Sequence, residues 1–303
     1  RISIPNKAKE RWISQPRTFP KVMNLHAVLL ERCGVNPASS LFFRKISVQF
    51  IYMKKILLSL AVLVVGSVGA FAYASHSWGG YHWARTANPF NLKLGDNVSS
   101  LWDSYLATTA ADWSVSNVLD MNMVAGASNP KNCKPVAGRV EVCNSKYGRN
   151  GWLGIASVWA NGQHIVQGTV KVNDTYFNTS KYNTPAWRNL VMCQEVGHTI
   201  GLDHQDEVFT NPNLGTCMDY TSDPLSNQHP NQHDYDMLET IYAHLDTTTT
   251  ANQTAASANQ EIDHQDRATW GKVIRTSSDK KASLYERDFG HGRKVFTFVI
   301  SAE

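Results

Sequence analysis

Apolar residues recur at helical spacing in two segments of the chain. The first segment, over about 98–113, follows the polar capping residue Asn97, and its apolar residues are three to four positions apart: Trp102, Leu106, Ala110 and Trp113. The second segment, over about 231–245, places four apolar side chains on one face: Leu238, Ile241, Tyr242 and Leu245. This spacing predicts an amphipathic helix in each segment.

The segment 151–177 has the pattern of extended chain. Glycines interrupt it, residues 169–172 alternate with period two, and Asn161-Gly162 predicts a hairpin turn. Thr184 followed by Pro185 then predicts the start of a further helix, because a proline at the first helical position loses no hydrogen bond. Helical and extended patterns thus alternate along the middle of the chain.

The N-terminal end has the pattern of a processed segment. Met53 is followed by two lysines, an apolar run and small residues near 70–74, which together predict a signal peptide over 53–74. The apolar run is shorter than the roughly 20 residues of a membrane-spanning helix, so we expect cleavage, with an uncleaved anchor as the alternative. Residues 1–52 would then precede the true start, as translated upstream sequence or as a cytoplasmic head, and we assign them no function.

The remaining chain divides by composition into three parts. Residues 75–246, rich in tryptophan, are expected to form one compact domain. Residues 247–268 begin with a stretch of Thr, Ala, Gln and Asn that is typical of a linker. Residues 269–303 contain an alternating run at 294–300 and are expected to form a small strand-rich appendage.

Setting the N-terminal segment aside reverses the sign of the net charge. Residues 1–55 hold 11 of the 29 Lys and Arg but 2 of the 25 Asp and Glu, which leaves 18 basic and 23 acidic residues. The remaining chain has no basic stripe, so we do not expect nucleic acid as a partner. After cleavage of the signal peptide we expect a monomer with no stable membrane association.

Four cysteines follow the signal peptide, and an even number suits a secreted or periplasmic protein. Of the three connectivities that four cysteines allow, we expect Cys133 to pair with Cys143 and Cys193 with Cys217. The second pair would tie the helix that starts near Pro185 to the turn that follows it.

That helix contains residues with the spacing of a metal centre. Gln194 and His198 are one turn apart and project from the same face, and Gly201 can adopt the left-handed conformation that ends a helix and brings His204 to the same point. Glu195 points about 100° around the helix, where it would reach a water on the metal but not the metal itself. The pattern predicts three zinc ligands and a general base for hydrolysis.

The string from Gln194 to His204 resembles the HExxHxxGxxH signature of the metzincin zinc metalloproteases, with Gln in place of the first His. Met218, fourteen residues after His204, is similar to the methionine of the family's Met-turn. Tyr220 stands where the astacin and serralysin branches have a tyrosine that contacts the zinc or stabilises the oxyanion. The order and size of the elements over 78–245 are similar to the matrixin branch.

The resemblance implies a metzincin-like α+β fold. In it, a twisted mixed β-sheet has the active-site helix and the first helix packed on it, and an irregular lower part contains the Met-turn. The resemblance also implies a secreted metalloendopeptidase with one catalytic zinc ion. An extended peptide or protein substrate would add as a strand to the edge of the sheet. Calcium sites cannot be read from the scattered Asp and Asn residues.

Gln194 is the departure from the family pattern. An amide oxygen is a weaker and harder donor than imidazole, so either zinc binds less tightly through Gln194, or Asp206 supplies a carboxylate in its place. A degenerate site would leave a catalytically weak or inactive metzincin-like domain that binds peptides or proteins. The intact Glu195 favours the enzyme, because a binding domain has no need of a base there.

Overall fold

The computed structural model describes residues 76–254 and 262–302. The predicted upstream segment (1–52) and signal peptide (53–74) lie outside the described residues and stay predictions. Within the described part of the chain, no helix is long and apolar enough to cross a membrane.

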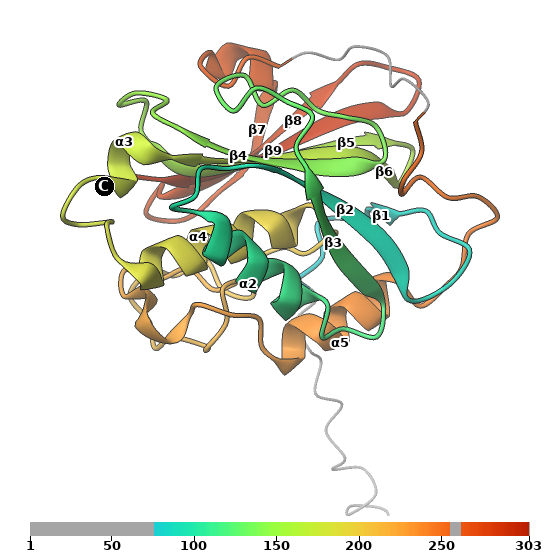
Figure 1. The fold of residues 1–303 in the computed structure, drawn as a ribbon, viewed down its shortest axis with the longest axis horizontal. Coiled ribbons are helices and arrows are strands. Elements are labelled where there is room, and N and C mark those ends of the chain that lie inside the picture. The colour runs from blue at the N-terminus through green and yellow to red at the C-terminus, as the bar shows by residue number, and fades with distance from the viewer. Residues whose placement is uncertain (1–75, 255–261, 303) are drawn as a thin grey trace, which may run out of the picture. The chain divides into compact units, whose positions relative to one another are not determined.

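A mixed sheet of nine strands forms the framework of residues 76–302 (Figure 1). Eight strands follow one another in the order β3-β2-β4-β6-β5-β9-β8-β7, and β1 pairs with β6 off this path. Strands β2, β3, β4 and β6 pair in parallel, whereas β5 and the three C-terminal strands are antiparallel to their neighbours. The strands are β1 His82–Trp83, β2 Phe90–Asn97, β3 Leu119–Ala125, β4 Arg139–Ser145, β5 Trp152–Asn161, β6 His164–Asn173, β7 Lys272–Thr276, β8 Ala282–Asp288 and β9 Arg293–Ser301.

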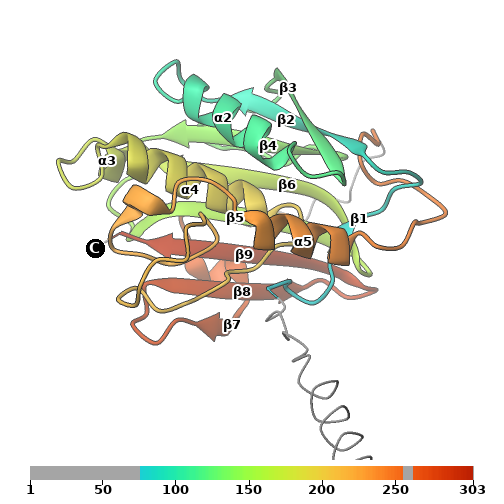
Figure 2. The ribbon, with the colours of Figure 1, turned by 90° about the horizontal axis from the view of Figure 1, so that it is seen from below.

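The three longer helices lie on one face of the sheet, as Figure 2 shows. Helix α4 packs against β5, β6 and α2, so it lies at the centre of this helical layer. The fold is therefore mixed α+β, as predicted. The helices are α2 Asp103–Trp113, α3 Asp174–Phe177, α4 Pro185–His198 and α5 Gln232–Ile241, with the 3-10 turns η1 Pro224–Ser226 and η2 Arg267–Trp270.

Helix α2 begins later than its predicted start near 98. Asn97 does not cap it, because Asn97 is the last residue of β2 and its amide donates to the carboxylate of Glu141 (2.5 Å) and to the carbonyl of Gly95 (3.1 Å). The N-cap position belongs instead to Trp102, whose side chain makes no capping hydrogen bond. The apolar face predicted from the spacing is buried, however, from Trp102 to Trp113.

Helix α5 begins as predicted and ends earlier. The side chain of Asn231 accepts hydrogen bonds from the first turn, and the carboxylate of Asp234 accepts one from the backbone N–H of Asn231, which completes a capping box. The helix ends at Ile241 rather than at 245, so Leu245 lies beyond it and is 59% exposed. The predicted apolar face is otherwise buried.

The central hairpin and the start of α4 are confirmed. Strands β5 and β6 pair in antiparallel fashion, and Gly162 turns between them with φ +61°. The extended segment ends at Asn173, earlier than the predicted 177, because the side chain of Asn173 caps the short helix α3. At α4, Thr184 accepts a hydrogen bond from the backbone N–H of Trp187 (3.3 Å) and Pro185 occupies the first turn.

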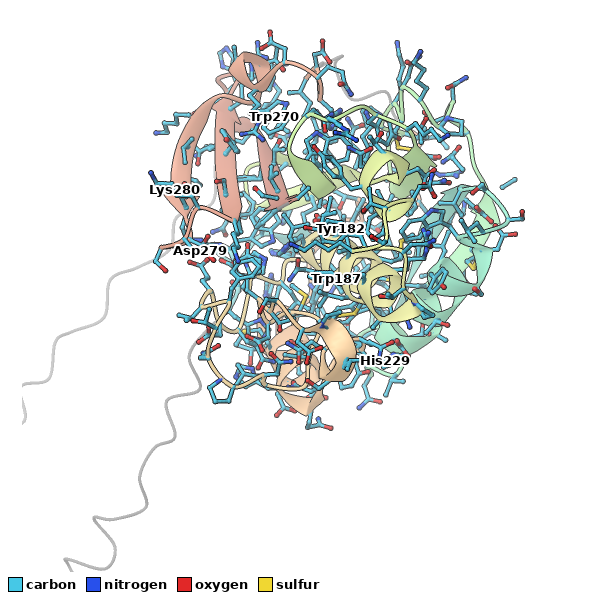
Figure 3. All side chains as sticks on the ribbon, turned by 90° about the vertical axis from the view of Figure 1, so that its left-hand side faces the viewer. Tyr182, Trp187, His229, Trp270, Asp279 and Lys280 are labelled. Atoms are coloured by element: carbon cyan, nitrogen blue, oxygen red, sulfur yellow. A yellow bond between two sulfur atoms is a disulfide. The ribbon has the colours of Figure 1, made fainter. Side chains whose placement is uncertain are left out.

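The segment 269–303, expected as a small appendage, contributes three strands to the main sheet. Strand β9 pairs with β5 along almost its whole length, from Ser301 opposite Trp152 to Arg293 opposite Asn161. Trp270, just before β7, and the turn at Asp279 and Lys280 lie at opposite ends of these strands (Figure 3). The C-terminal strands are thus continuous with the sheet, because β9 satisfies the backbone groups along the edge of β5.

The described parts of the predicted linker also pack on the domain. Thr250 donates its backbone N–H to the carbonyl of Ala84 (2.9 Å), Asn252 donates to that of Gly138 (2.7 Å), and Ala251 between them is buried. Residues 255–261 lie outside the described part.

Both predicted disulfides are present. Cys133 is joined to Cys143, and Cys193 is joined to Cys217. The second bond links α4 to the segment that contains Met218, which is the connection expected from the sequence.

Gly201 ends the turn that follows α4. Its φ is +100°, a conformation that side chains disfavour, and a Cβ atom there would overlap the carbonyl oxygen of Tyr81. Gly215 also has a positive φ (+74°), but a Cβ there would meet no atom within 4 Å. Substituting each glycine by alanine therefore distinguishes two costs: the strained backbone conformation, present at both positions, and the steric clash, present only at Gly201.

We expect Gly201→Ala to lower the free energy of unfolding by about 2–4 kcal/mol and Gly215→Ala by about 1–2 kcal/mol, because only the first adds a clash to the conformational cost. Urea unfolding of the oxidised protein measures both. Equal losses would show that the close approach of Tyr81 to Gly201 does not constrain the turn.

Candidate metal and catalytic site

Helix α4 presents three predicted site residues in a fully buried layer. Gln194, Glu195 and His198 are each 1% exposed. The helix approaches the sheet closely, because a Cβ atom on Gly154 of β5 would lie 2.6 Å from the Glu195 carboxylate. Glycine at this position in β5 is therefore what allows a carboxylate to lie between the helix and the sheet.

The two predicted histidine ligands meet at the end of α4. The ring centroids of His198 and His204 are 4.5 Å apart, with the rings nearly perpendicular. Nδ1 of His198 lies 2.9 Å from the carbonyl oxygen of Leu202, so this nitrogen donates and Nε2 keeps its lone pair. Gly201 makes the turn that brings His204 back, as the sequence predicted.

Gln194 lies one turn before His198 and has an unused oxygen. Its amide nitrogen donates to the carbonyl of Cys217 (3.0 Å), whereas its Oε1 is buried with no hydrogen-bond partner among the described residues. A buried acceptor without a partner costs free energy. The hydrogen bond to Cys217 fixes which end of the amide is free, and that end is the one able to bind a cation.

Glu195 is buried in the same layer. Burial raises the pKa of Glu195 well above its usual range, although the backbone N–H of Ala156 acts in the opposite direction. Its Oε2 has no hydrogen-bond partner in the described part of the chain. Burial, together with the neighbouring His204, lowers the pKa of His198, so His198 is neutral and able to bind a metal.

Met218 lies against α4, as expected of a Met-turn residue. A Cβ atom on Gly197 would lie 2.6 Å from the sulfur of Met218, and Met218 is fully buried. The methionine therefore packs against the helix directly beside His198. The carbonyl of Met218 also accepts a hydrogen bond from the backbone N–H of Gln205 (2.7 Å), which joins this turn to the segment after His204.

Tyr220 contacts the second histidine with its ring. The centroids of Tyr220 and His204 are 3.9 Å apart, and on its other side Tyr220 stacks on Phe209 at 4.7 Å. Tyr220 is buried beside this predicted ligand. The contact is one of packing.

Asp206, the alternative ligand, is not the carboxylate that lies near His204. Its Oδ1 accepts a hydrogen bond from the backbone N–H of Val208 (2.6 Å) and stabilises a local turn. The carboxylates close to His204 Nδ1 are those of Asp203 (3.4 Å) and Glu207 (3.9 Å). These three residues form a group whose ligand atoms lie within 4.8 Å of one another.

An arginine from the C-terminal strands neutralises this acidic pair. Arg275 of β7 forms ion pairs with Asp203 and, through Nε, with Glu207 at 2.8 Å. Burial alone would raise the pKa of Asp203, but hydrogen bonds and charge from His204 and Arg275 outweigh it and hold the pKa far below 3.8. The guanidinium thus takes the place that a cation would have between these carboxylates.

The same C-terminal strands cover the histidines. The ring of Phe298 in β9 stacks on His198 with a centroid distance of 4.1 Å and an interplanar angle of 10°. The gap bounded by His204, Tyr220, Arg275 and Phe298 is too small to hold a water molecule. The sequence patterns did not reveal these contacts, because β7 and β9 are more than 70 residues from His198 along the chain.

No protein-family model matches the chain, and no curated protein matches it.

We expect Arg275→Gln to lower the free energy of unfolding by about 2–3 kcal/mol at neutral pH, because it leaves a buried carboxylate on Asp203 without its cation. The matched control, Lys294→Gln, removes a peripheral ion pair with Glu286 (3.2 Å) and should cost about 0–1 kcal/mol. Chemical denaturation of both variants measures the difference.

The Arg275 effect should also depend on pH in a defined direction. Because the folded-state pKa of Asp203 is depressed, the stabilisation is complete above its unfolded value of 3.8 and is lost as the pH falls below it. The difference in the free energy of unfolding between wild type and Arg275→Gln should therefore become smaller in acid. A difference in the free energy of unfolding that stays constant from pH 7 to pH 3 would contradict the stabilising ion pair between Arg275 and Asp203.

Proposed function

We propose that this chain is a secreted zinc-dependent metalloendopeptidase, with zinc held by Gln194, His198 and His204 and with Glu195 as the general base. The observation that supports this most is the meeting of His198 and His204 at the end of α4, the helix whose residues Gln194 and Glu195 each carry a buried oxygen without a partner in the described part of the chain, Oε1 and Oε2 respectively. Two imidazoles and one amide oxygen form a donor set that zinc accepts.

The buried layer fits the requirements of hydrolysis. Zinc would supply Lewis acidity towards a scissile carbonyl and would acidify water. Glu195 would take the proton of the attacking water on Oε2 and pass it to the leaving amine. The hydrogen bond from His198 to Leu202 fixes the ring so that Nε2 faces away from the backbone.

The two disulfides support the proposed compartment. Both bonds belong to a class that persists in oxidising surroundings, which suits a secreted or periplasmic enzyme. We propose peptides or unfolded proteins as substrates and a monomer as the acting form.

Access to the site requires movement of the C-terminal strands. Strand β5, which packs against α4, pairs with β6 on one side and β9 on the other, so a peptide cannot add to the edge of β5 while β9 is in place. Phe298 also covers His198. The described arrangement is therefore a closed form of the proposed enzyme, and substrate must displace β9.

A second function is favoured by three of these observations. Gln194 weakens the ligand set relative to three histidines, Phe298 covers His198, and the gap beside His204 is too small for a water molecule. These features suit a metzincin-like domain that binds peptide or protein partners without cleaving them.

Zinc content and peptidase activity separate these functions. We expect the oxidised full-length protein to bind zinc and to cleave an unfolded protein. Glu195→Gln should retain the zinc and lose about 100-fold to 10 000-fold in rate, because it removes only the base. Chelator should abolish activity and a zinc supplement should restore it.

Phe298→Ala distinguishes a closed site from an inactive one. This variant removes the ring over His198, so its cleavage rate should exceed that of wild type while still depending on Glu195. Cleavage that survives Glu195→Gln, or no cleavage by zinc-loaded wild type and Phe298→Ala alike, would overturn the peptidase proposal in favour of the binding domain.

Gln194→His tests the ligand role of Gln194 without relying on activity. Imidazole is the stronger donor, so zinc affinity should rise by about tenfold or more. Competition with a chromogenic chelator measures the change. Gln194→Leu is the matched control and should weaken zinc binding; equal affinities in all three proteins would remove Gln194 from the ligand set.

A further inference from the structure

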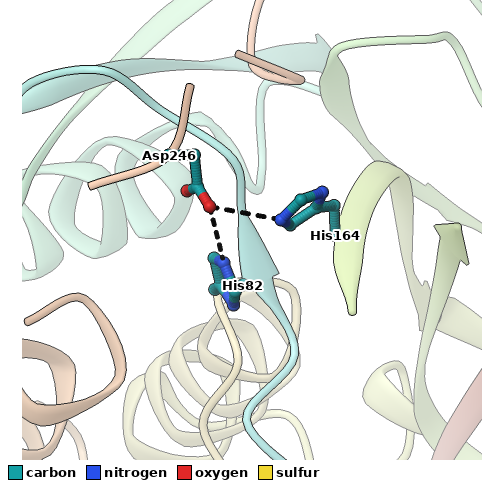
Figure 4. A group of neighbouring side chains, drawn as sticks. All are labelled: His82, His164 and Asp246. Atoms are coloured by element: carbon teal, nitrogen blue, oxygen red, sulfur yellow. Dashed lines mark ion pairs between the residues drawn. The ribbon is translucent and has the colours of Figure 1, made fainter. Parts of the chain in front are cut away.

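A second cluster of metal-binding side chains lies at a different place in the fold. Strand β1 pairs in parallel with β6, and the register sets His82 opposite His164. The chain after α5 brings Asp246 to the same point, as Figure 4 shows. His244 joins them, since its Nε2 lies 3.1 Å from Nε2 of His82. Three separate segments thus converge on one small volume.

The ligand atoms of His82, His164 and Asp246 all lie within 4.8 Å of one another, a spacing that one metal ion can bridge, and His244 lies outside this group of three. The Nε2 atoms of His82, His164 and His244 lie 3.6, 3.2 and 3.7 Å from the same carboxylate oxygen, Oδ1 of Asp246. Ligands about 2.0–2.2 Å from a tetrahedral zinc ion lie roughly 3.3–3.6 Å from one another. Three imidazoles and one carboxylate are a donor set that zinc and similar ions prefer.

Neighbouring groups orient the ligands as they do in metal sites. Nδ1 of His82 donates to the carbonyl of Gly80 (2.8 Å), so Nε2 is the nitrogen left to bind. The other carboxylate oxygen of Asp246, Oδ2, accepts hydrogen bonds from the backbone and the guanidinium of Arg85, both at 3.1 Å. This leaves Oδ1 directed at the histidines.

We propose a second metal site suited to a divalent transition ion of the zinc class, in which His82, His164 and Asp246 hold the ion and His244, beside His82, turns in as the fourth ligand. It is separate from the site on α4 and does not depend on the proposed peptidase activity. Because all four ligands come from the protein, its role is structural. The ion ties β1 and β6 to the chain after α5.

A metal ion bound to His82 would also affect helix α4, because the residues next to His82 contact the end of that helix and the turn after it. Trp83, the residue after His82, donates its indole N–H to the carbonyl of Thr199 (2.9 Å) at the end of α4. Tyr81, the residue before His82, contacts Gly201. A metal on His82 would therefore hold in place the segment that supports the turn between His198 and His204.

Zinc titration of the metal-free, oxidised full-length protein tests the site. We expect two zinc ions per wild-type chain, one in His164→Ala and one in His244→Ala, with affinity for the missing ion reduced by about 100-fold or more. Both histidines are partly or largely exposed, so these variants should fold. His229→Ala, which removes an exposed histidine paired with Asp112 at 2.7 Å, is the matched control and should still bind two.

The possible stoichiometries separate this site from the one on α4. One zinc in wild type and none in His164→Ala or His244→Ala would support this site and count against the zinc proposed for Gln194. Equal zinc content in wild type, His164→Ala and His244→Ala would overturn it and show that the histidines form only an ionic network around Asp246.

Discussion

The burial of polar groups between α4 and β5 is the constraint on which the candidate site depends. A carboxylate and an amide oxygen lie in this layer without partners among the described residues. Isolated buried charge is costly, so Glu195 must be protonated or lie beside a cation. Apolar side chains would pack in this layer at a lower cost, and the proposed metal site gives the buried oxygens of Gln194 and Glu195 a role.

The surrounding structure is arranged around this layer. Glycines at 154, 197 and 201 let the sheet, Met218 and the Tyr81 backbone approach the helix closely. The Cys193–Cys217 bond holds the Met218 segment against α4. On the remaining side, β9 places Phe298 on His198, and β7 places Arg275 on the carboxylates that flank His204. The C-terminal strands thus complete the enclosure of the proposed centre.

Short sequence patterns correctly predicted the features that depend on neighbouring residues along the chain. Thr184 and Pro185 marked the start of α4, Asn161-Gly162 marked the hairpin, and the helical spacing from 194 to 204 predicted the meeting of His198 and His204. The start of α2 was wrong because Asn97 bonds to Glu141, a partner on another strand. The predicted end of α5 was wrong because the spacing of apolar residues continues to Leu245, which lies beyond the helix and is exposed.

Long-range pairing accounts for the rest of what the sequence did not predict. The run 294–300 was recognisable as a strand, but its partner β5 was not, and so the enclosure of His198 was missed. Asp206 was chosen as the alternative ligand by its proximity in sequence, whereas Asp203 and Glu207 are the carboxylates near His204. The histidines at 82, 164 and 244 are distant in sequence: the pairing of β1 with β6 brings the first two together, and the chain after α5 brings His244 to them.

A zinc-edge anomalous difference map from a crystal of the zinc-loaded protein tests the central claim most directly. The account predicts a peak on α4 within about 2.0–2.2 Å of Nε2 of His198 and of Oε1 of Gln194, with His204 as the third ligand. A map from fully loaded crystals with no peak between His198 and His204 would contradict a catalytic zinc centre in this protein.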